Sequence, residues 1–158
     1  MALRQIRMQN DEILRKKSRE VEIDDIRLEK NQGLIDDMLD TMYHYNGVGL
    51  AAIQVGILKQ IIVIDIEDGQ GPYILINPKI LKTKGQKECE EGCLSFPNEF
   101  GKVVRPTEVV VEFYDRFGKF TKLKAKDLLA QAICHEVDHL NGIVFTDLVI
   151  PGTLEYVT

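Results

Sequence analysis

The chain has 158 residues, 44% of them hydrophobic and 28% charged, and a formal net charge of −5. These values are typical of one globular domain spanning residues 1–158, with a core that needs no disulfide bonds. The acidic balance, the lack of a basic stripe and the lack of an apolar run of ~20 residues argue against nucleic-acid binding and against a membrane span.

The first predicted element is an amphipathic helix over residues 25–45. Its apolar positions recur at the helical period, and acidic residues fill the opposite face. Asn46-Gly47 then gives a helix stop. The apolar positions are Leu34, Ile35, Met38, Leu39 and Met42.

Strand candidates follow in the middle of the chain. Residues 60–68 and 72–81 have the composition of strands, the second interrupted by Pro78. Residues 108–126 form a predicted β-hairpin around Arg116-Phe117-Gly118.

A second helix is predicted from Asp127, as its N-cap, to Leu140, before Asn141-Gly142. It is apolar on most sides, which is typical of a buried core helix. We therefore expect an α+β fold, in which small antiparallel sheets pack around this central helix.

This helix contains the motif His135-Glu136-x-x-His139. Two histidines four residues apart lie about 40° apart around a helix axis, so they face the same way. Zinc-type hydrolases hold the metal with two such imidazoles and move a proton with the Glu. The alternative is that both histidines serve packing alone. The chain has only three histidines, so chance placement of two in this motif is improbable.

A catalytic site of this kind needs a third protein ligand. The metzincin continuation is excluded, because Phe145 stands where its third His belongs. Thermolysin-like enzymes take a downstream Glu as the third ligand. The candidate here is Glu155, whose position near the chain end argues against this class. Cys93, within "EGCLSFP", is the better candidate, since a thiolate suits a borderline-soft cation. Cys89 is the alternative, although its charged neighbours predict an exposed side chain.

Residues 47–56, "GVGLAAIQVG", have little side-chain bulk, so their backbone can approach a ligand closely. Gln54 offers an amide donor within this tight segment. The alternative is close packing against the core helix, with Gln54 on the surface.

Together, "GVGLAAIQ", "EGCLS" and "HEVDHL" resemble the three motifs of peptide deformylase of the bacterial type, in that family's order and approximate spacing. The resemblance covers essentially the whole chain. Two positions depart from the family pattern. Cys134 stands where Gln is usual before the first His, and Ile53 stands where Pro or Thr is frequent.

The resemblance implies a hydrolase that removes the N-formyl group from the formyl-methionine of newly synthesised polypeptides and releases formate. It implies one Fe(II) per chain, with zinc, nickel or cobalt as substitutes. Cys93, His135 and His139 would be the ligands, with water in the fourth place. Glu136 would carry the proton from that water to the leaving amine.

The resemblance also assigns roles around the reacting carbon. The Gln54 amide and the Leu94 backbone N–H would stabilise the oxyanion. Val48, Leu94, Leu128 and the flank of His135 would form the methionine pocket. The backbone around Val48 and Gly49 would accept the peptide as an added strand.

Three charged residues are candidates for positioning the ligands. Glu91 and Asp138 would orient the imidazoles, and Arg105 would pair with one of them. The alternative is ordinary salt bridging. Cys134 points away from the metal face of its helix, so it is predicted to be a packed thiol.

Two other functions stay open at this stage. One is a hydrolase of the same fold for a different acyl group. The other is a purely structural metal site, whose fourth position is filled by Cys134 or Cys89.

The N-terminal segment lacks a signal-like apolar core, which predicts a cytoplasmic protein. The substrates would be nascent peptides near the ribosome, without the docking C-terminal helix of some family members.

Overall fold

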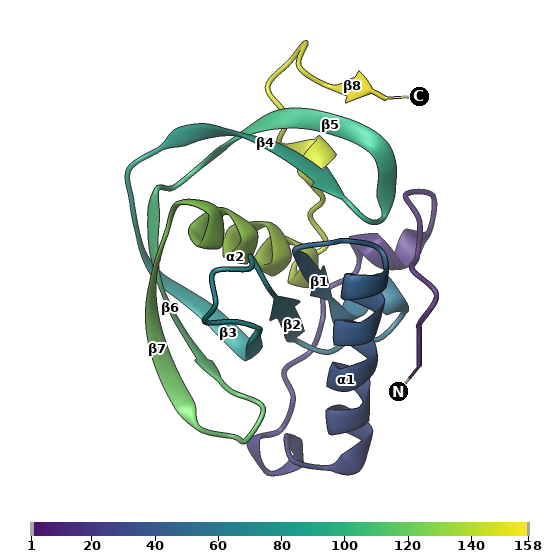
Figure 1. Ribbon diagram of the computed structural model, residues 1–158, viewed down its shortest axis with the longest axis vertical. Coiled ribbons are helices and arrows are strands. Elements are labelled where there is room, and N and C mark those ends of the chain that lie inside the picture. The colour runs from purple at the N-terminus through teal and green to yellow at the C-terminus, as the bar shows by residue number, and fades with distance from the viewer. Residues whose placement is uncertain (1, 158) are drawn as a thin grey trace.

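Two antiparallel sheets surround α2 (Asp127–Leu140) in the computed structural model, which describes residues 2–157 (Figure 1). The predicted α+β fold with a central helix is confirmed. The five-stranded sheet has the order β1-β2-β3-β6-β7, and the three-stranded sheet has the order β4-β5-β8. The strands are β1 (Gly49–Ala51), β2 (Ile61–Ile64), β3 (Tyr73–Lys84), β4 (Lys87–Cys93), β5 (Phe96–Arg105), β6 (Glu108–Tyr114), β7 (Phe120–Lys126) and β8 (Glu155–Tyr156).

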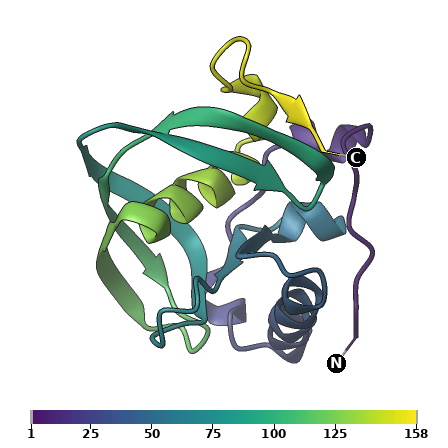
Figure 2. The same cartoon turned by 45° about the horizontal axis from the view of Figure 1, so that its top comes forward.

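The core forms because α2 is apolar on most of its surface. Ala130 and Ile133 of α2 are fully buried and belong to the same cluster as Val109, Val111 and Ala125 of the large sheet. On another side of α2 lies the long β4–β5 hairpin, which Figure 2 shows as a ribbon crossing over the helix. The helix is thereby held between the two sheets, and its histidines point toward the hairpin.

A second cluster joins α1 (Glu29–His44) to the other edge of the large sheet. Leu34, Ile35, Met38 and Met42 are buried against Leu50 of β1 and other residues of this cluster. The predicted helix began at residue 25, but residues 23–25 form the short 3₁₀ helix η2 (Ile23–Asp25), and α1 starts only after it. Three further 3₁₀ helices are η1 (Glu12–Arg15), η3 (Ala52–Val55) and η4 (Phe145–Asp147).

Several predicted boundaries were wrong. The strand predicted for residues 72–81 continues to Lys84 as β3, and a register shift between Ile76 and Lys79 accommodates Pro78. β2 ends at Ile64, four residues before the predicted end. Asp127 is not an N-cap: the N-cap is Lys126, and no side chain caps the helix.

Cys89 was predicted to be exposed, and this was wrong. It is buried, because side chains alternate along β4, so that Cys89 and Glu91 point inward while Glu88 and Glu90 face solvent. Among residues 2–157, no helix combines the length and the apolar character that a membrane span requires.

Candidate active site

The three predicted metal ligands come together at one end of the space between α2 and the β4–β5 hairpin. Cys93 is the last residue of β4, and its Sγ lies 3.4 Å from Nε2 of His139. His135 and His139 stand one helical turn apart, with ring centroids 5.0 Å from each other. One donor atom from each of the three residues lies within 4.8 Å of the others.

This donor set fits a divalent metal ion. One thiol and two imidazoles suit zinc, iron and other first-row ions, and three protein ligands leave one position open. Burial, with the neighbouring His135, lowers the pKa of His139, so its imidazole stays neutral as a ligand must. Burial opposes protonation of His135, but hydrogen bonds with Cys93 and Glu91 raise its pKa. A metal ion and a proton therefore compete for the imidazole of His135.

Glu136 lies beside these ligands. Its Oε2 is 4.0 Å from Nε2 of His135, and its buried Oε1 has no hydrogen-bond partner among the described residues. Burial raises the pKa of Glu136 to about 7. A carboxyl group with such a pKa is able to accept and return a proton near neutral pH.

A buried ionic network fixes the orientation of His135. Glu91 Oε1 lies 2.9 Å from Nδ1 of His135, so the other ring nitrogen faces the site. Arg105 donates two hydrogen bonds to Glu91, at 2.7 and 2.8 Å. Burial alone would raise the pKa of Glu91, but the hydrogen bonds from Arg105 and His135 hold it at about 2.

Asp138 contacts Arg105 rather than an imidazole. Nη1 of Arg105 donates to Asp138 at 2.7 Å, so Arg105 pairs with both acids instead of one. Asp138 thus reaches the ligands only through Arg105 and Glu91.

Gln54 is held in a fixed orientation at the same site. Its Oε1 accepts a hydrogen bond from the Ala51 backbone at 3.0 Å, and its Nε2 lies 3.1 Å from Ser95 Oγ and 3.4 Å from Cys93 Sγ. Gln54 is therefore buried, not on the surface. The role of Ser95 was missed, although it follows Cys93 and Leu94 within the "EGCLS" motif.

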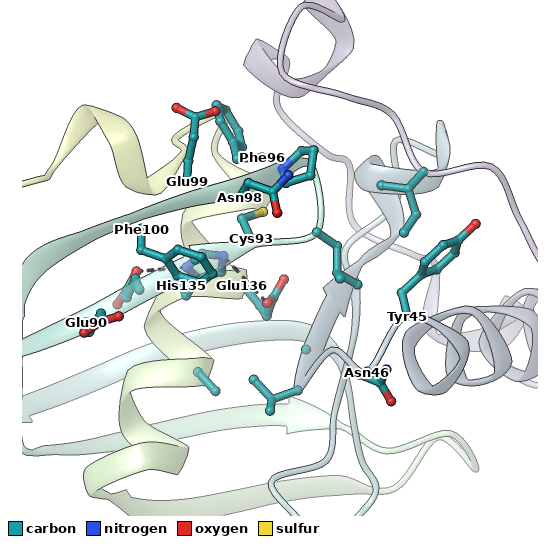
Figure 3. Close-up of a pocket in the computed structure, with 18 of the residues that line it drawn as sticks. Tyr45, Asn46, Glu90, Cys93, Phe96, Asn98, Glu99, Phe100, His135 and Glu136 are labelled. Atoms are coloured by element: carbon teal, nitrogen blue, oxygen red, sulfur yellow. Dashed lines mark hydrogen bonds and ion pairs between the residues drawn. The ribbon is translucent and has the colours of Figure 1, made fainter. Parts of the chain in front are cut away.

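A cavity of about 610 Å³ opens onto these groups. Figure 3 shows Cys93, His135 and Glu136 close together, with Phe100 and Tyr45 among the residues around them. The four residues predicted to bind substrate all line this cavity: Val48, Gly49, Leu94 and Leu128. Further lining residues that the sequence did not single out are Tyr45, Phe96, Asn98, Phe100 and Gln131.

The backbone at Gly49 lies against the Glu136 carboxylate. A Cβ on Gly49 would lie 2.6 Å from Oε2 of Glu136.

We expect Gly49→Ala to displace that carboxylate and lower kcat/KM about 100-fold, since a shift of ~1 Å has effects of that size. Metal content should not change. The matched control is Gly33→Ala, where the added methyl group meets nothing within 4 Å. Wild-type rates in Gly49→Ala would contradict this role.

Cys134 does not line the cavity at Cys93, His135 and Glu136. It is buried, and burial raises its pKa to about 11. It lines a separate hollow of about 270 Å³ together with Arg105 and Asp138.

We expect Cys134→Ala to keep one metal per chain and to lose less than about tenfold in rate, at most ~1.4 kcal/mol of transition-state stabilisation. Metal stoichiometry is the decisive readout. If Cys134→Ala lost the metal while Cys93→Ala kept it, the assignment of Cys93 as a metal ligand would be wrong.

The model of the polypeptide deformylase family matches residues 3–153. The chain belongs to this family. Peptide deformylase of Caldicellulosiruptor bescii is 57% identical over 150 residues, which cover 95% of this chain and 87% of that protein. Peptide deformylase 1 of Clostridium acetobutylicum is 55% identical over 147 residues, covering 93% and 95%.

Solved deformylase structures share the fold. The crystal structure of a peptide deformylase from Legionella pneumophila has a TM-score of 0.88 and 45% identity, and the match covers 94% of this chain and 87% of that one. The peptide deformylase from Thermotoga maritima has a TM-score of 0.87 and 38% identity, covering 94% and 99%. Deformylases are metal-dependent hydrolases that remove the N-formyl group of nascent polypeptides. Cys93, His135 and His139 could hold a metal ion for that chemistry.

Proposed function

We propose that this chain hydrolyses the N-formyl group of formyl-methionine at the start of newly synthesised polypeptides and releases formate. The observation that carries the proposal is the convergence of Cys93, His135 and His139 beside the buried Glu136, at a cavity with apolar walls. Membership of the deformylase family supports the same reaction. Residues 1–158 would act as one catalytic domain in the cytoplasm, near the ribosome.

Cys93, His135 and His139 would hold the metal, which supplies a Lewis acid for the formyl carbonyl and the attacking water. Glu136 takes the proton from that water as its oxygen attacks the formyl carbon. The same carboxyl then gives the proton to the amine nitrogen, the C–N bond breaks, and formate leaves. A pKa of about 7 suits both transfers.

Two donors would stabilise the charge that develops on the formyl oxygen. One is Nε2 of Gln54, whose orientation is fixed by Ala51 and Ser95. The other is the backbone N–H of Leu94. Removal of one such donor typically costs ~3–4 kcal/mol in the transition state.

The peptide would bind along β1. This strand lies at the edge of the five-stranded sheet, so its free side can pair with an extended peptide. Val48 and Leu128 are half exposed at the cavity, although both are apolar. A methionine side chain packed against them and Leu94 would cover this apolar surface.

The test of this proposal compares two substrates that differ only in the acyl group. Formyl-Met-Ala-Ser and acetyl-Met-Ala-Ser peptides are incubated with metal-replete protein, and the free amine is measured. We expect cleavage of the formyl peptide and little or none of the acetyl peptide. Equal rates would indicate a hydrolase for a different acyl group.

We propose Fe(II) as the native metal, with zinc, nickel or cobalt as substitutes. Iron on a thiolate is sensitive to oxygen, and Cys93 would be open to oxidation to the sulfenic and higher acids. Air should therefore inactivate the iron-loaded protein, while nickel- or cobalt-loaded protein stays active. The measurement is activity against time in air for each metal form. Undiminished activity of the iron form after long exposure would contradict this assignment.

A further inference from the structure

Six lysines occupy one face of the large sheet. β6 is the central strand of three, with β3 on one side and β7 on the other (Figure 1). The strand register places Lys79 and Lys122 on either side of Glu112, and Lys82 and Lys124 on either side of Val110. Each of these sets forms a row across the three strands, and a third row consists of Lys84, Glu108 and Lys126. We call these six lysines the lysine face.

A register shift in β3 makes this face continuous. Ile80 pairs with Val111, but Lys82 pairs with Val110, so Leu81 is an extra residue in the strand. Without it, Lys82 and Lys84 would point to the opposite side from Lys79, because successive strand residues alternate. The shift therefore keeps all three lysines of β3 on the same side as those of β7.

The lysine face lies on the side of the large sheet that points away from α2. The alternate residues Val109, Val111 and Ala125 pack in the core cluster that includes Ala130 and Ile133 of α2. All six lysines are exposed on the other side of the sheet. A large partner could therefore cover this face and leave the cavity at Cys93 and Glu136 open.

Most of the positive charge of this face is not neutralised. Lys126 and Lys124 lie 3.4 and 3.9 Å from Glu108. Within residues 2–157, the other four lysines make no salt bridge. Six lysines with Glu108 and Glu112 carry a formal charge of +4 in a chain of −5, so the remainder of the chain carries −9. Such an asymmetric field orients the molecule toward a polyanion with this face first.

We propose that the lysine face binds the phosphate backbone of structured RNA. Lysines two residues apart on a strand are about 7 Å apart, and β3 and β7 are about 10 Å apart, so the charges form a rigid lattice for repeated phosphates. A hollow of about 160 Å³ lies within the face, lined by Lys82, Lys84 and Lys124 among others. A lipid surface fits less well, since apart from the extra residue Leu81 the three rows offer only Val110 as an apolar residue to insert.

Binding at this face does not depend on the deformylase chemistry. The composition argued against nucleic acid because the lysines are spread over two segments of an acidic chain. Only the pairing of β3 and β7 with β6 brings them together. Because phosphate contacts do not read sequence, hairpins of different sequence should bind equally well.

The test uses the metal-replete protein and two fluorescein-labelled RNA hairpins of unrelated sequence, with binding followed by anisotropy between ~50 and ~200 mM salt. The variant is the triple substitution Lys82→Gln, Lys84→Gln and Lys124→Gln. The matched control changes three exposed lysines on other elements, Lys17→Gln, Lys30→Gln and Lys102→Gln. Deformylation of a formyl-Met peptide and thermal unfolding are measured for each protein.

We expect the wild type and the control to bind both hairpins with steep salt dependence. The face variant should bind at least about tenfold more weakly, with the slope of log K against log salt reduced by about 3. Its peptide deformylation should be unchanged. No binding at ~50 mM salt would overturn the proposal, as would an equal loss in both triple variants. Binding to phosphatidylserine vesicles but not to RNA, lost in the face variant, would assign the face to lipid and also overturn it.

Discussion

Glu136→Gln should keep one metal ion per chain and lose about 10³-fold or more in kcat/KM. The substitution keeps the shape of the side chain but removes its ability to accept a proton. General acid–base groups contribute ~10²–10⁴-fold, and here the same carboxyl group serves both transfers. The measurements are metal content and formate release on the same sample.

The matched control is Glu90→Gln, the same chemical change at an exposed residue that lines the cavity. Its rate should stay near that of the wild type. A Glu136→Gln protein with wild-type activity would show that the proton travels by another route.

Glu91→Ala should have the largest effect on stability. Among residues 2–157, it leaves Arg105, of which 5% is exposed, with only Asp138 as an ionic partner. Removal of one member of a buried pair typically costs ~3–5 kcal/mol, because the remaining charge stays out of water without that partner. It also frees His135, so metal affinity should fall about 10–100-fold. Urea unfolding and metal titration measure the two effects.

The exposed pair of Arg116 and Asp36 supplies the control. Asp36→Ala breaks a 2.9 Å ion pair in which the carboxylate is 42% exposed, and should cost less than ~1 kcal/mol. Equal effects of the two substitutions would refute the structural role of Glu91.

The pH dependence of this network has a defined sign. The folded pKa of Glu91, about 2, lies below its ordinary value of 4.5. Its contribution to stability is therefore full above pH ~4.5 and is lost as the pH falls toward ~2. The stability difference between the wild type and Glu91→Ala should narrow over that range.

The helical period was sufficient to predict part of the site from the sequence. Positions 135, 136 and 139 have fixed angles on a helix, so the orientation of His135 and His139 follows from their spacing. The approach of Cys93 to His139 is a contact across 46 residues, and no local pattern encodes it. It was predicted from the order of the motifs and their resemblance to the family, with Cys89 left open on residue chemistry alone.

Strand register was the information that the sequence did not provide. β4 and β5 each contain several charged residues and one glycine, so neither gave a strand signal, and the burial of Cys89 and Glu91 was missed with them. The double pairing of Arg105 depends on β5 meeting both β4 and α2. The lysine face likewise depends on one extra residue in β3.

The most direct measurement is formate release from a formyl-Met peptide by protein purified without oxygen, with the metal content determined on the same sample. We expect one divalent metal ion per chain and one formate for each free amine produced. Cys93→Ala should lose both the metal and the activity. A wild-type protein that carries its metal and releases no formate would contradict the proposed function.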